Sequence, residues 1–197
     1  MSTNNLSSSA SGRFSLSAAA LHILAMALML MDHLWATLLP AQDWLTCAGR
    51  LAFPIFAFMA VEGYFHTHSF RKYALRMLGF ALLSEFPFDW AFFSGVWWGH
   101  QNVYFTLLLG LLAMKALDTF RTGEGTPDAR GILCAAACTG AAALLRCDYD
   151  VMGMALILAL YLTRKDRAAQ CIAGAVFTLF EPVAPVSYTH LTLPTIR

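Results

Sequence analysis

A histidine and a carboxylate stand side by side inside an apolar run, because residues 29–40 read MLMDHLWATLLP with Asp32 and His33 in the middle. Histidine titrates near neutral pH, so it can take up and return a proton. A nearby carboxylate can fix the imidazole tautomer and stabilise its cation. Neighbouring residues of a helix point about 100° apart, so we expect His33 to carry the chemistry and Asp32 to support packing or orient the ring.

The composition indicates the environment of this pair. Of the 197 residues, 58% are hydrophobic and only 13% are charged, with a mean hydropathy of +0.59. Soluble domains carry about 25% charged residues, so this chain is predicted to be an integral membrane protein. The net charge of +1 gives no indication of nucleic-acid binding, and five cysteines without a Cys-x-x-Cys motif indicate neither a disulfide framework nor a zinc site.

Apolar segments long enough for helices recur along the chain, and a span needs about 20 mostly apolar residues. The sequence therefore predicts an all-α, polytopic transmembrane bundle of about seven helices. They are placed at 17–39, 44–65, 72–93, 101–119, 130–147, 149–164 and 168–184. Pro54 and Pro87 fall inside the second and third helices, where each should kink its helix and free a carbonyl.

Lysine and arginine gather in alternate loops of this arrangement, after the second, fourth and sixth helices. The loops at 40–43 and 94–100 carry neither residue. Because positively charged loops stay on the cytoplasmic side, we expect the N-terminus and the basic loops to be cytoplasmic.

Polar residues then converge near the outer end of the bundle. The cluster comprises Asp32, His33, Arg50, Glu85, Asp89, His100, Gln101, Asn102, Arg146, Asp148, Tyr149 and Asp150. Charged groups inside a bilayer cost at least about 2.5–3.5 kcal/mol each and usually face a protein interior or a cavity. Glu85 or Asp89, spaced i,i+4, could partner His33, and Arg50 could neutralise these acids or hold an anionic group. The alternative is an ion-pair network that only pins helices together.

The inner end carries a second set of polar residues. Glu62 and His66 are spaced i,i+4, but no third metal ligand is evident, and we predict no metal site. Arg71, Lys72 and Arg76 are typical of residues that set topology. They would also suit a phosphorylated cofactor that approaches from the cytoplasm.

The two ends of the sequence differ from the apolar body. Residues 1–14 are rich in Ser and Asn and are predicted to be disordered. Residues 15–185 are expected to form a single transmembrane domain. The end, VSYTHLTLPTIR (186–197), breaks the membrane pattern and resembles translated adapter sequence, so we expect a non-native tail; an ordinary short polar tail is the alternative.

Four stretches resemble the TraX family, which is named for the F-pilin acetylase of conjugative plasmids. They are LHILAMALMLMDHLWATLLP, GRLAFPIFAFMAVEGYFHTHSFRKYALRMLGFALLSEFPFD, NVYFTLLLGLLAMKALD and CDYDVMGMALILALYL, and they extend from about Leu21 to Tyr161. The resemblance implies a multi-pass protein of the bacterial cytoplasmic membrane and an acetyl- or acyltransferase. It further implies membership of a wider superfamily of membrane acyltransferases that use acyl-CoA and an intramembrane histidine.

On this resemblance, His33 would act as general base or carry the acyl group transiently, with Asp32 or Glu85 orienting it. Substrate binding would fall to Arg50, Asp89, Asn102 and Glu62, with Arg50 or Asn102 also placed to stabilise an oxyanion. Arg71, Lys72 and Arg76 would bind the phosphates of acyl-CoA. The acceptor would be an amine or hydroxyl, with a pilin-like peptide as one candidate, and the lipid bilayer is the expected surrounding partner. A small proton-coupled permease and a non-catalytic assembly protein are the alternatives.

Overall fold

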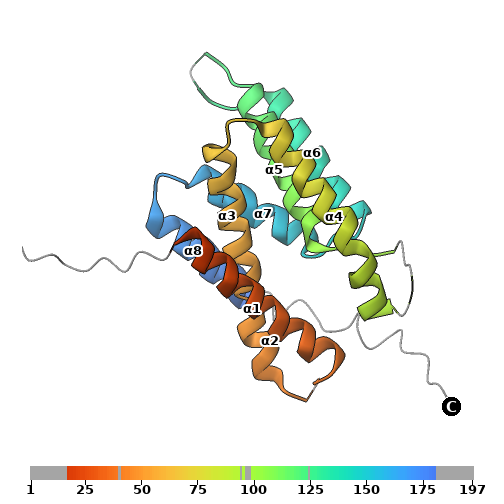
Figure 1. Cartoon of the computed structure of the whole chain (residues 1–197). Helices are drawn as coiled ribbons and strands as arrows, with labels where there is room; N and C mark the ends of the chain where they lie inside the picture. The colour runs from red at the N-terminus through yellow and green to blue at the C-terminus, as the bar shows by residue number, and fades with distance from the viewer. Residues whose placement is uncertain (1–16, 40, 94, 96–98, 124, 181–197) are drawn as a thin grey trace, which may run out of the picture.

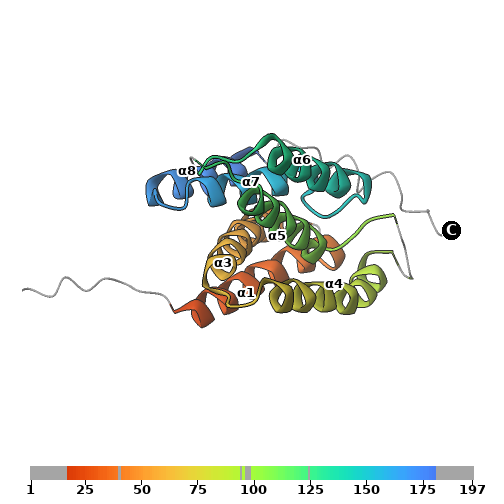
Figure 2. The same cartoon turned by 90° about the horizontal axis from the view of Figure 1, so that it is seen from above.

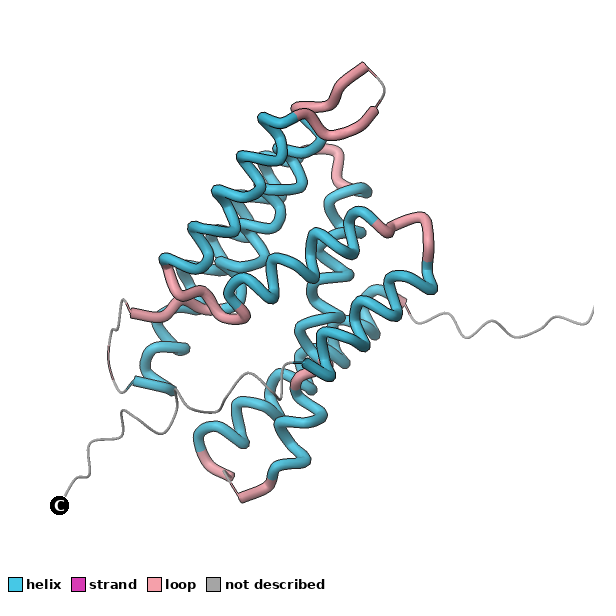
Figure 3. Tube along the Cα trace, turned by 180° about the vertical axis from the view of Figure 1, so that it is seen from behind, coloured by secondary structure: helices cyan, strands magenta, loops and turns pink. Residues whose placement is uncertain are grey.

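The regular elements of the chain are helices. The computed structural model describes residues 17–39, 41–93, 95, 99–123 and 125–180, and no strand occurs among them (Figure 3). The elements are α1 (Ala18–Thr37), α2 (Asp43–Gly49), α3 (Ala52–His66), α4 (Phe70–Phe93), α5 (Val103–Thr119), α6 (Ala129–Leu144), α7 (Asp150–Leu162) and α8 (Arg167–Phe180) (Figure 1). The predicted all-α fold class is confirmed.

The second predicted helix, 44–65, is divided into α2 and α3. The break falls at Arg50 and Leu51, and Pro54 lies in the first turn of α3. Proline has no N–H to donate to the carbonyl four residues earlier, which here is that of Arg50. At the break itself, the N–H of Leu51 donates to the carbonyl of Ala48, three residues earlier, at 3.2 Å. At the expected kink the segment is thus divided into two helices, although Arg50 and Leu51 keep α-helical backbone angles, whereas α4 continues through Pro87.

The other predicted helices lie close to their expected positions, although 181–184 of the seventh fall outside the described residues. The segments expected to be disordered (1–14) and non-native (186–197) also lie outside them.

The helices are arranged in three rows when seen from above (Figure 2). α1 and α4 form one row, α3 and α5 lie in the middle, and α6, α7 and α8 form the opposite row. The core fills the space among α3, α5 and α7, where Phe53, Leu111, Met114, Met154 and Ile157 are fully buried. α4 packs chiefly on α5, and α1 packs on α2 and α3, so α1 and α4 touch each other only sparsely.

Glycine and threonine set the spacing of α1 and α2. A Cβ added at Gly49 would lie 2.5 Å from Cβ and 2.9 Å from Cα of Asp32. One turn earlier in α2, the hydroxyl of Thr46 donates a hydrogen bond of 2.8 Å to Oδ1 of Asp32. The small residue lets the backbones approach, and the hydroxyl then satisfies the carboxylate at the contact.

Two helical stretches of the described chain are long and apolar enough to cross a membrane: Ala18–Thr37 and Asp43–His66, which joins α2 and α3. They have 20 and 24 residues. α6, α7 and α8 are apolar but shorter, with 16, 13 and 14 residues.

Candidate functional site

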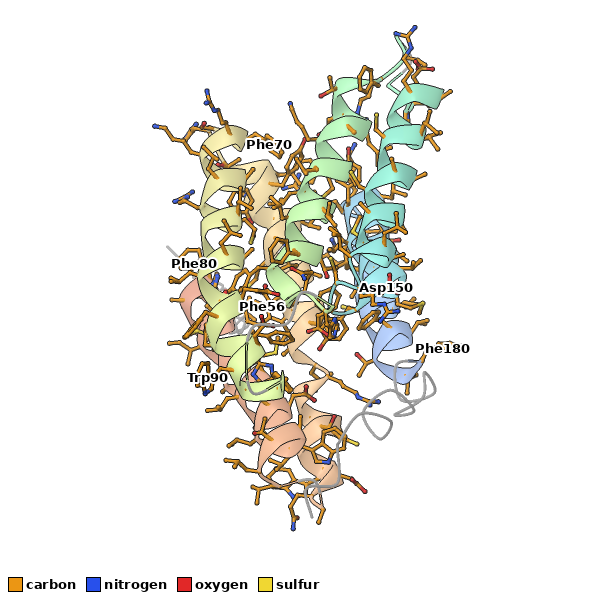
Figure 4. The ribbon with its side chains drawn as sticks, turned by 90° about the vertical axis from the view of Figure 1, so that its right-hand side faces the viewer. Phe56, Phe70, Phe80, Trp90, Asp150 and Phe180 are labelled. Atoms are coloured by element: carbon orange, nitrogen blue, oxygen red, sulfur yellow. The ribbon has the colours of Figure 1, made fainter. Side chains whose placement is uncertain are left out.

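A pocket of 360 Å³ lies where the sparse contact between α1 and α4 leaves space, with α3 and α5 behind it. Its polar lining residues are His33, Ser84, Asn102 and Asp148. The apolar lining consists of Met26, Met29, Leu30, Phe56, Pro87, Phe88, Ala91, Phe92, Val103, Tyr104 and Leu107. In Figure 4, Phe70 marks the upper end of α4, Trp90 marks the lower end and Phe56 lies at an intermediate height. The pocket therefore adjoins the lower half of α4.

His33 and Asp32 diverge as expected for neighbours on a helix. His33 lines the pocket, and its ring meets that of Phe92 edge-to-face with 5.2 Å between centroids. Asp32 faces α2, where it accepts the hydrogen bond from Thr46. The imidazole of His33 thus faces a space that a reactant could fill. The carboxylate of Asp32 instead attaches α1 to α2 through Thr46.

Asn102 joins the beginning of α5 to the middle of α4. Its side-chain oxygen accepts from the N–H of Tyr104 at 3.0 Å, which caps the helix. Its Nδ2 donates to the carbonyl of Ala81 at 2.8 Å and also to Oε2 of Glu85, and its backbone N–H donates to the same Oε2 at 3.2 Å. Both amide hydrogens are therefore engaged, and we do not assign an oxyanion to Asn102; its substrate-binding role stays a prediction.

Glu85 contacts Asn102 rather than His33 in the hydrogen bonds of the described residues. Its second oxygen, Oε1, is buried and has no hydrogen-bond partner within the described part of the chain. Asp89, one turn further along α4, is only 2% exposed. Asp89 therefore lies inside the protein and Glu85 is half-buried, and the orientation of His33 by Glu85 stays a prediction.

Arg50 lies at the break between α2 and α3, outside the lining of the pocket. Its guanidinium makes no hydrogen bond or ion pair with the residues that the structure describes. It is therefore available to a ligand, but the structure does not bring it together with Glu85 or Asp89.

Asp148 lines the pocket from the connection between α6 and α7, and no individual role was predicted for it from the sequence. Its N–H donates to the carbonyl of Gln101 at 2.8 Å, and its carbonyl accepts from the hydroxyl of Thr106. Burial raises the pKa of Asp148 to about 6; His100 opposes this shift and the carboxylate of Asp32 adds to it. The pKa of Asp148 therefore lies above that of an exposed aspartate.

The opposite end of the bundle holds a separate polar network around Asp118. Tyr64 and Tyr161 each donate a hydrogen bond of 2.6 Å to its carboxylate, from α3 and α7. Arg121 binds the same carboxylate at 2.6 Å and 3.0 Å, and it also donates to the Tyr161 hydroxyl at 2.7 Å. This network ties three helices and a loop together. The feature of the sequence that could have indicated this network is Asp118 itself, a carboxylate near the end of an otherwise largely apolar helix.

Glu62 lies at this same end, where Arg164 binds its two oxygens at 3.1 Å and 3.4 Å. It is thus distant from the pocket in the fold, and its predicted part in substrate binding is untested. Arg71, Lys72 and Arg76 are exposed on the first turns of α4. Within the described residues, no group of three or more His, Cys, Asp or Glu side chains is arranged to hold a metal ion.

The pocket combines a base, a second titratable group and an apolar enclosure. An imidazole can remove a proton from an amine or hydroxyl, and its cation then stands beside any negative charge that develops on a carbonyl oxygen. This arrangement is suited to a reaction in which a bound amine or hydroxyl loses a proton.

Comparison with known proteins connects this fold to one family. The family model described as TraX protein matches residues 17–193. The probable fimbrial assembly protein FimC, serogroup H1, of Dichelobacter nodosus is 32% identical over 114 residues, which are 50% of this chain and 45% of that protein. Protein TraX of Escherichia coli strain K12 is 33% identical over 110 residues, which are 55% of this chain and 42% of that protein.

A further Protein TraX of Escherichia coli is 28% identical over 110 residues. The matched segment thus spans less than half the length of each of these relatives. No solved structure matches significantly. Because the family model covers most of its length, the chain belongs to the TraX family.

Proposed function

We propose that this protein is a membrane acyltransferase that moves an acyl group, with acetyl as the first candidate, from acyl-CoA to an amine or hydroxyl. The observation that carries the proposal is the position of His33 on the wall of a 360 Å³ pocket with apolar surroundings. In such a site a general base is kept from bulk water, so its proton transfer is directed to a bound reactant.

The outward faces of the helices support a membrane location. Large apolar side chains are exposed around the bundle, including Leu83 on α4 (71%), Leu133 on α6 (71%) and Leu179 on α8 (72%). Soluble monomers rarely expose apolar patches larger than a few hundred Å², and a lipid environment removes the cost of such surfaces. With the basic loops on the cytoplasmic side, the pocket lies toward the outer half of the bilayer.

The basic residues at the start of α4 are suited to the phosphates of acyl-CoA. Ser84, at the inner side of the pocket, follows Arg76 by eight positions, which is a rise of about 12 Å along a helix. An extended thioester arm would need to cover this distance along α4 if its phosphates bind at Arg76, and about 20 Å if they bind at Arg71. The arm would then enter the pocket beside Ser84 and reach the wall that carries His33.

The chemistry of the pocket and the names of the similar proteins support one class of acyl acceptor. A fimbrial assembly protein and TraX proteins are similar to this chain, so a pilin-like peptide is the first candidate acceptor. Its amine would attack the thioester carbon while His33 takes the amine proton. The imidazolium would then stabilise the oxyanion and protonate the leaving thiolate.

The test is acyl transfer from radiolabelled acetyl-CoA in membranes that contain the protein. We expect His33→Ala to lower transfer by about 100-fold or more, since general base catalysis contributes about 10²–10⁴. His22→Ala is the matched control, because His22 is an exposed histidine on the same helix, outside the pocket. Unchanged transfer in His33→Ala would remove the proposed role, and proton-driven solute uptake without CoA-dependent transfer would favour a permease.

A further inference from the structure

We propose that Asp148 binds the nucleophilic group of the acyl acceptor, accepting a hydrogen bond from its amine or hydroxyl across the pocket from α1. This inference rests on the proposed acyltransferase function, and it adds a residue that contacts the acceptor and for which no role has been assigned. It makes the connection between α6 and α7 a part of the substrate site.

The first support is the position of the side chain. Of the described residues that line the pocket, Asp148 is the only one with a carboxylate, since Asp32 faces α2 and Glu85 binds Asn102. His33 approaches the same space from α1. A reactant in this pocket therefore meets a base on one helix and an acceptor of hydrogen bonds on a loop.

The second support is the backbone that holds Asp148. Three residues around it have left-handed backbone angles although none is glycine: Arg146 (φ 51°), Tyr149 (φ 64°) and Asp150 (φ 41°). Such conformations cost roughly 1–2 kcal/mol per residue and persist only when the surroundings enforce them. Here the Tyr149 ring stacks on the buried Phe53 at 4.0 Å, and Gln101 and Thr106 bind the backbone of Asp148 itself.

The third support is the electrostatic environment of the carboxylate, in which His100 and the N–H of Tyr149 are favourable neighbours. No salt bridge to Lys or Arg involves Asp148 within the described residues. The titratable groups that influence it are His100 from the segment before α5 and Asp32 from α1, and the second of these is repulsive. A carboxylate held in such a place by a strained loop is typical of a functional residue.

The chemical step is balanced as follows. The acceptor nitrogen or oxygen attacks the thioester carbonyl carbon and forms a new C–N or C–O bond, while the C–S bond breaks. His33 takes the proton that the acceptor loses and returns it to the departing sulfur, which leaves as free CoA thiol. Asp148 keeps its hydrogen bond to the acceptor and is unchanged at the end of the cycle.

Asp148→Asn tests the inference, because asparagine keeps the size and the local backbone preferences of aspartate but removes its charge. Thiol release from acetyl-CoA is measured in purified, detergent-solubilised protein with n-octylamine as the acceptor, and label transfer from acetyl-CoA to native membrane proteins is measured in parallel. We expect KM for n-octylamine to rise about 10- to 100-fold, because a charge-assisted hydrogen bond to the acceptor is lost. Label transfer at low acceptor concentration should fall by the same factor. KM for acetyl-CoA should stay unchanged.

Asp150→Asn is the matched control, since this second carboxylate, at the first residue of α7, is exposed and lies toward the side of α6 and α7 in Figure 4. Kinetics of Asp148→Asn equal to those of the wild type would overturn the inference and leave the proposed function intact. A lower melting temperature together with equal losses for both substrates would show a purely structural residue and would also overturn it. Absence of transfer in the wild-type protein, in both assays, would instead refute the proposed function.

Discussion

Replacing Gly49 by alanine tests how α1 is positioned against α2. The new Cβ would lie 2.5 Å from Cβ of Asp32, whereas carbon atoms in contact are about 3.5–4.0 Å apart. The two helices would therefore have to separate by roughly 1 Å at this point. The separation would also stretch the 2.8 Å hydrogen bond from Thr46 to Asp32.

The expected loss of stability follows from these contacts. Overpacking costs about 1–3 kcal/mol, and a weakened hydrogen bond to a charged group costs up to about 1.5–3 kcal/mol. Alanine returns up to about 1 kcal/mol as a better helix former than glycine. The free energy of unfolding should thus fall by about 2–4 kcal/mol, which lowers Tm by roughly 5–15 °C for a chain of this size.

Thermal unfolding of the purified protein in detergent, followed by the loss of helical circular dichroism, measures this change. Gly79→Ala is the control, because a Cβ at Gly79 in α4 would meet nothing within 4 Å; its Tm should stay the same or rise. Acyl transfer should also fall in Gly49→Ala, by up to about 100-fold, since His33 adjoins the displaced Asp32 and a 1 Å shift can cost that much. A Gly49→Ala protein that melts with the wild type would refute the reasoning.

Three further predictions concern the polar network around Asp118, the pH dependence of stability and the membrane topology. Asp118→Asn should lower the free energy of unfolding by about 1–3 kcal/mol, because it weakens hydrogen bonds to a charged acceptor from three side chains; the detergent melting assay measures it. The folded-state pKa of Asp148, about 6, lies above its unfolded value of about 3.9, so its contribution to stability is complete below about pH 4 and is lost as pH rises through 6. Asp148→Asn should therefore melt above the wild type at pH 8, with the difference vanishing near pH 4.5. Asp43→Cys in a cysteine-free background should react with an impermeant thiol reagent from outside the cell, and Lys165→Cys only after the membrane is opened; the reverse pattern would invert the topology.

The helices could be predicted from the sequence because their signal is local. Long apolar runs and the proline at position 54 indicated the helices and the disturbance of the second one, and both appear in the structure. That the disturbance divides this segment into α2 and α3 was not predictable. Pro54 removes one hydrogen bond, but whether the helix bends or is divided there depends also on the helices that pack against it from elsewhere in the chain.

The partners of the polar side chains were less predictable, because hydropathy gives the length of a helix and not its rotation or neighbours. Glu85 or Asp89 was predicted as a partner of His33, but that Glu85 also binds Asn102 was not predicted; this contact forms because α4 packs chiefly on α5. Asp148 carried no periodic signal because it lies in a loop. Its place in the pocket depends on contacts with Gln101 and Thr106, more than forty residues earlier in the chain.

In the strained connection between α6 and α7, the substitutions that raise the stability of the fold are expected to lower acyl transfer. Arg146→Gly would remove the strain of a left-handed backbone conformation at this arginine. For a residue other than glycine, that conformation costs about 1–2 kcal/mol. The same change would loosen the loop that presents Asp148, and Asp148→Asn would stabilise the fold at alkaline pH while removing the carboxylate. A search for thermostable variants is therefore expected to select substitutions in this loop first, and the variants it yields should be the less active ones.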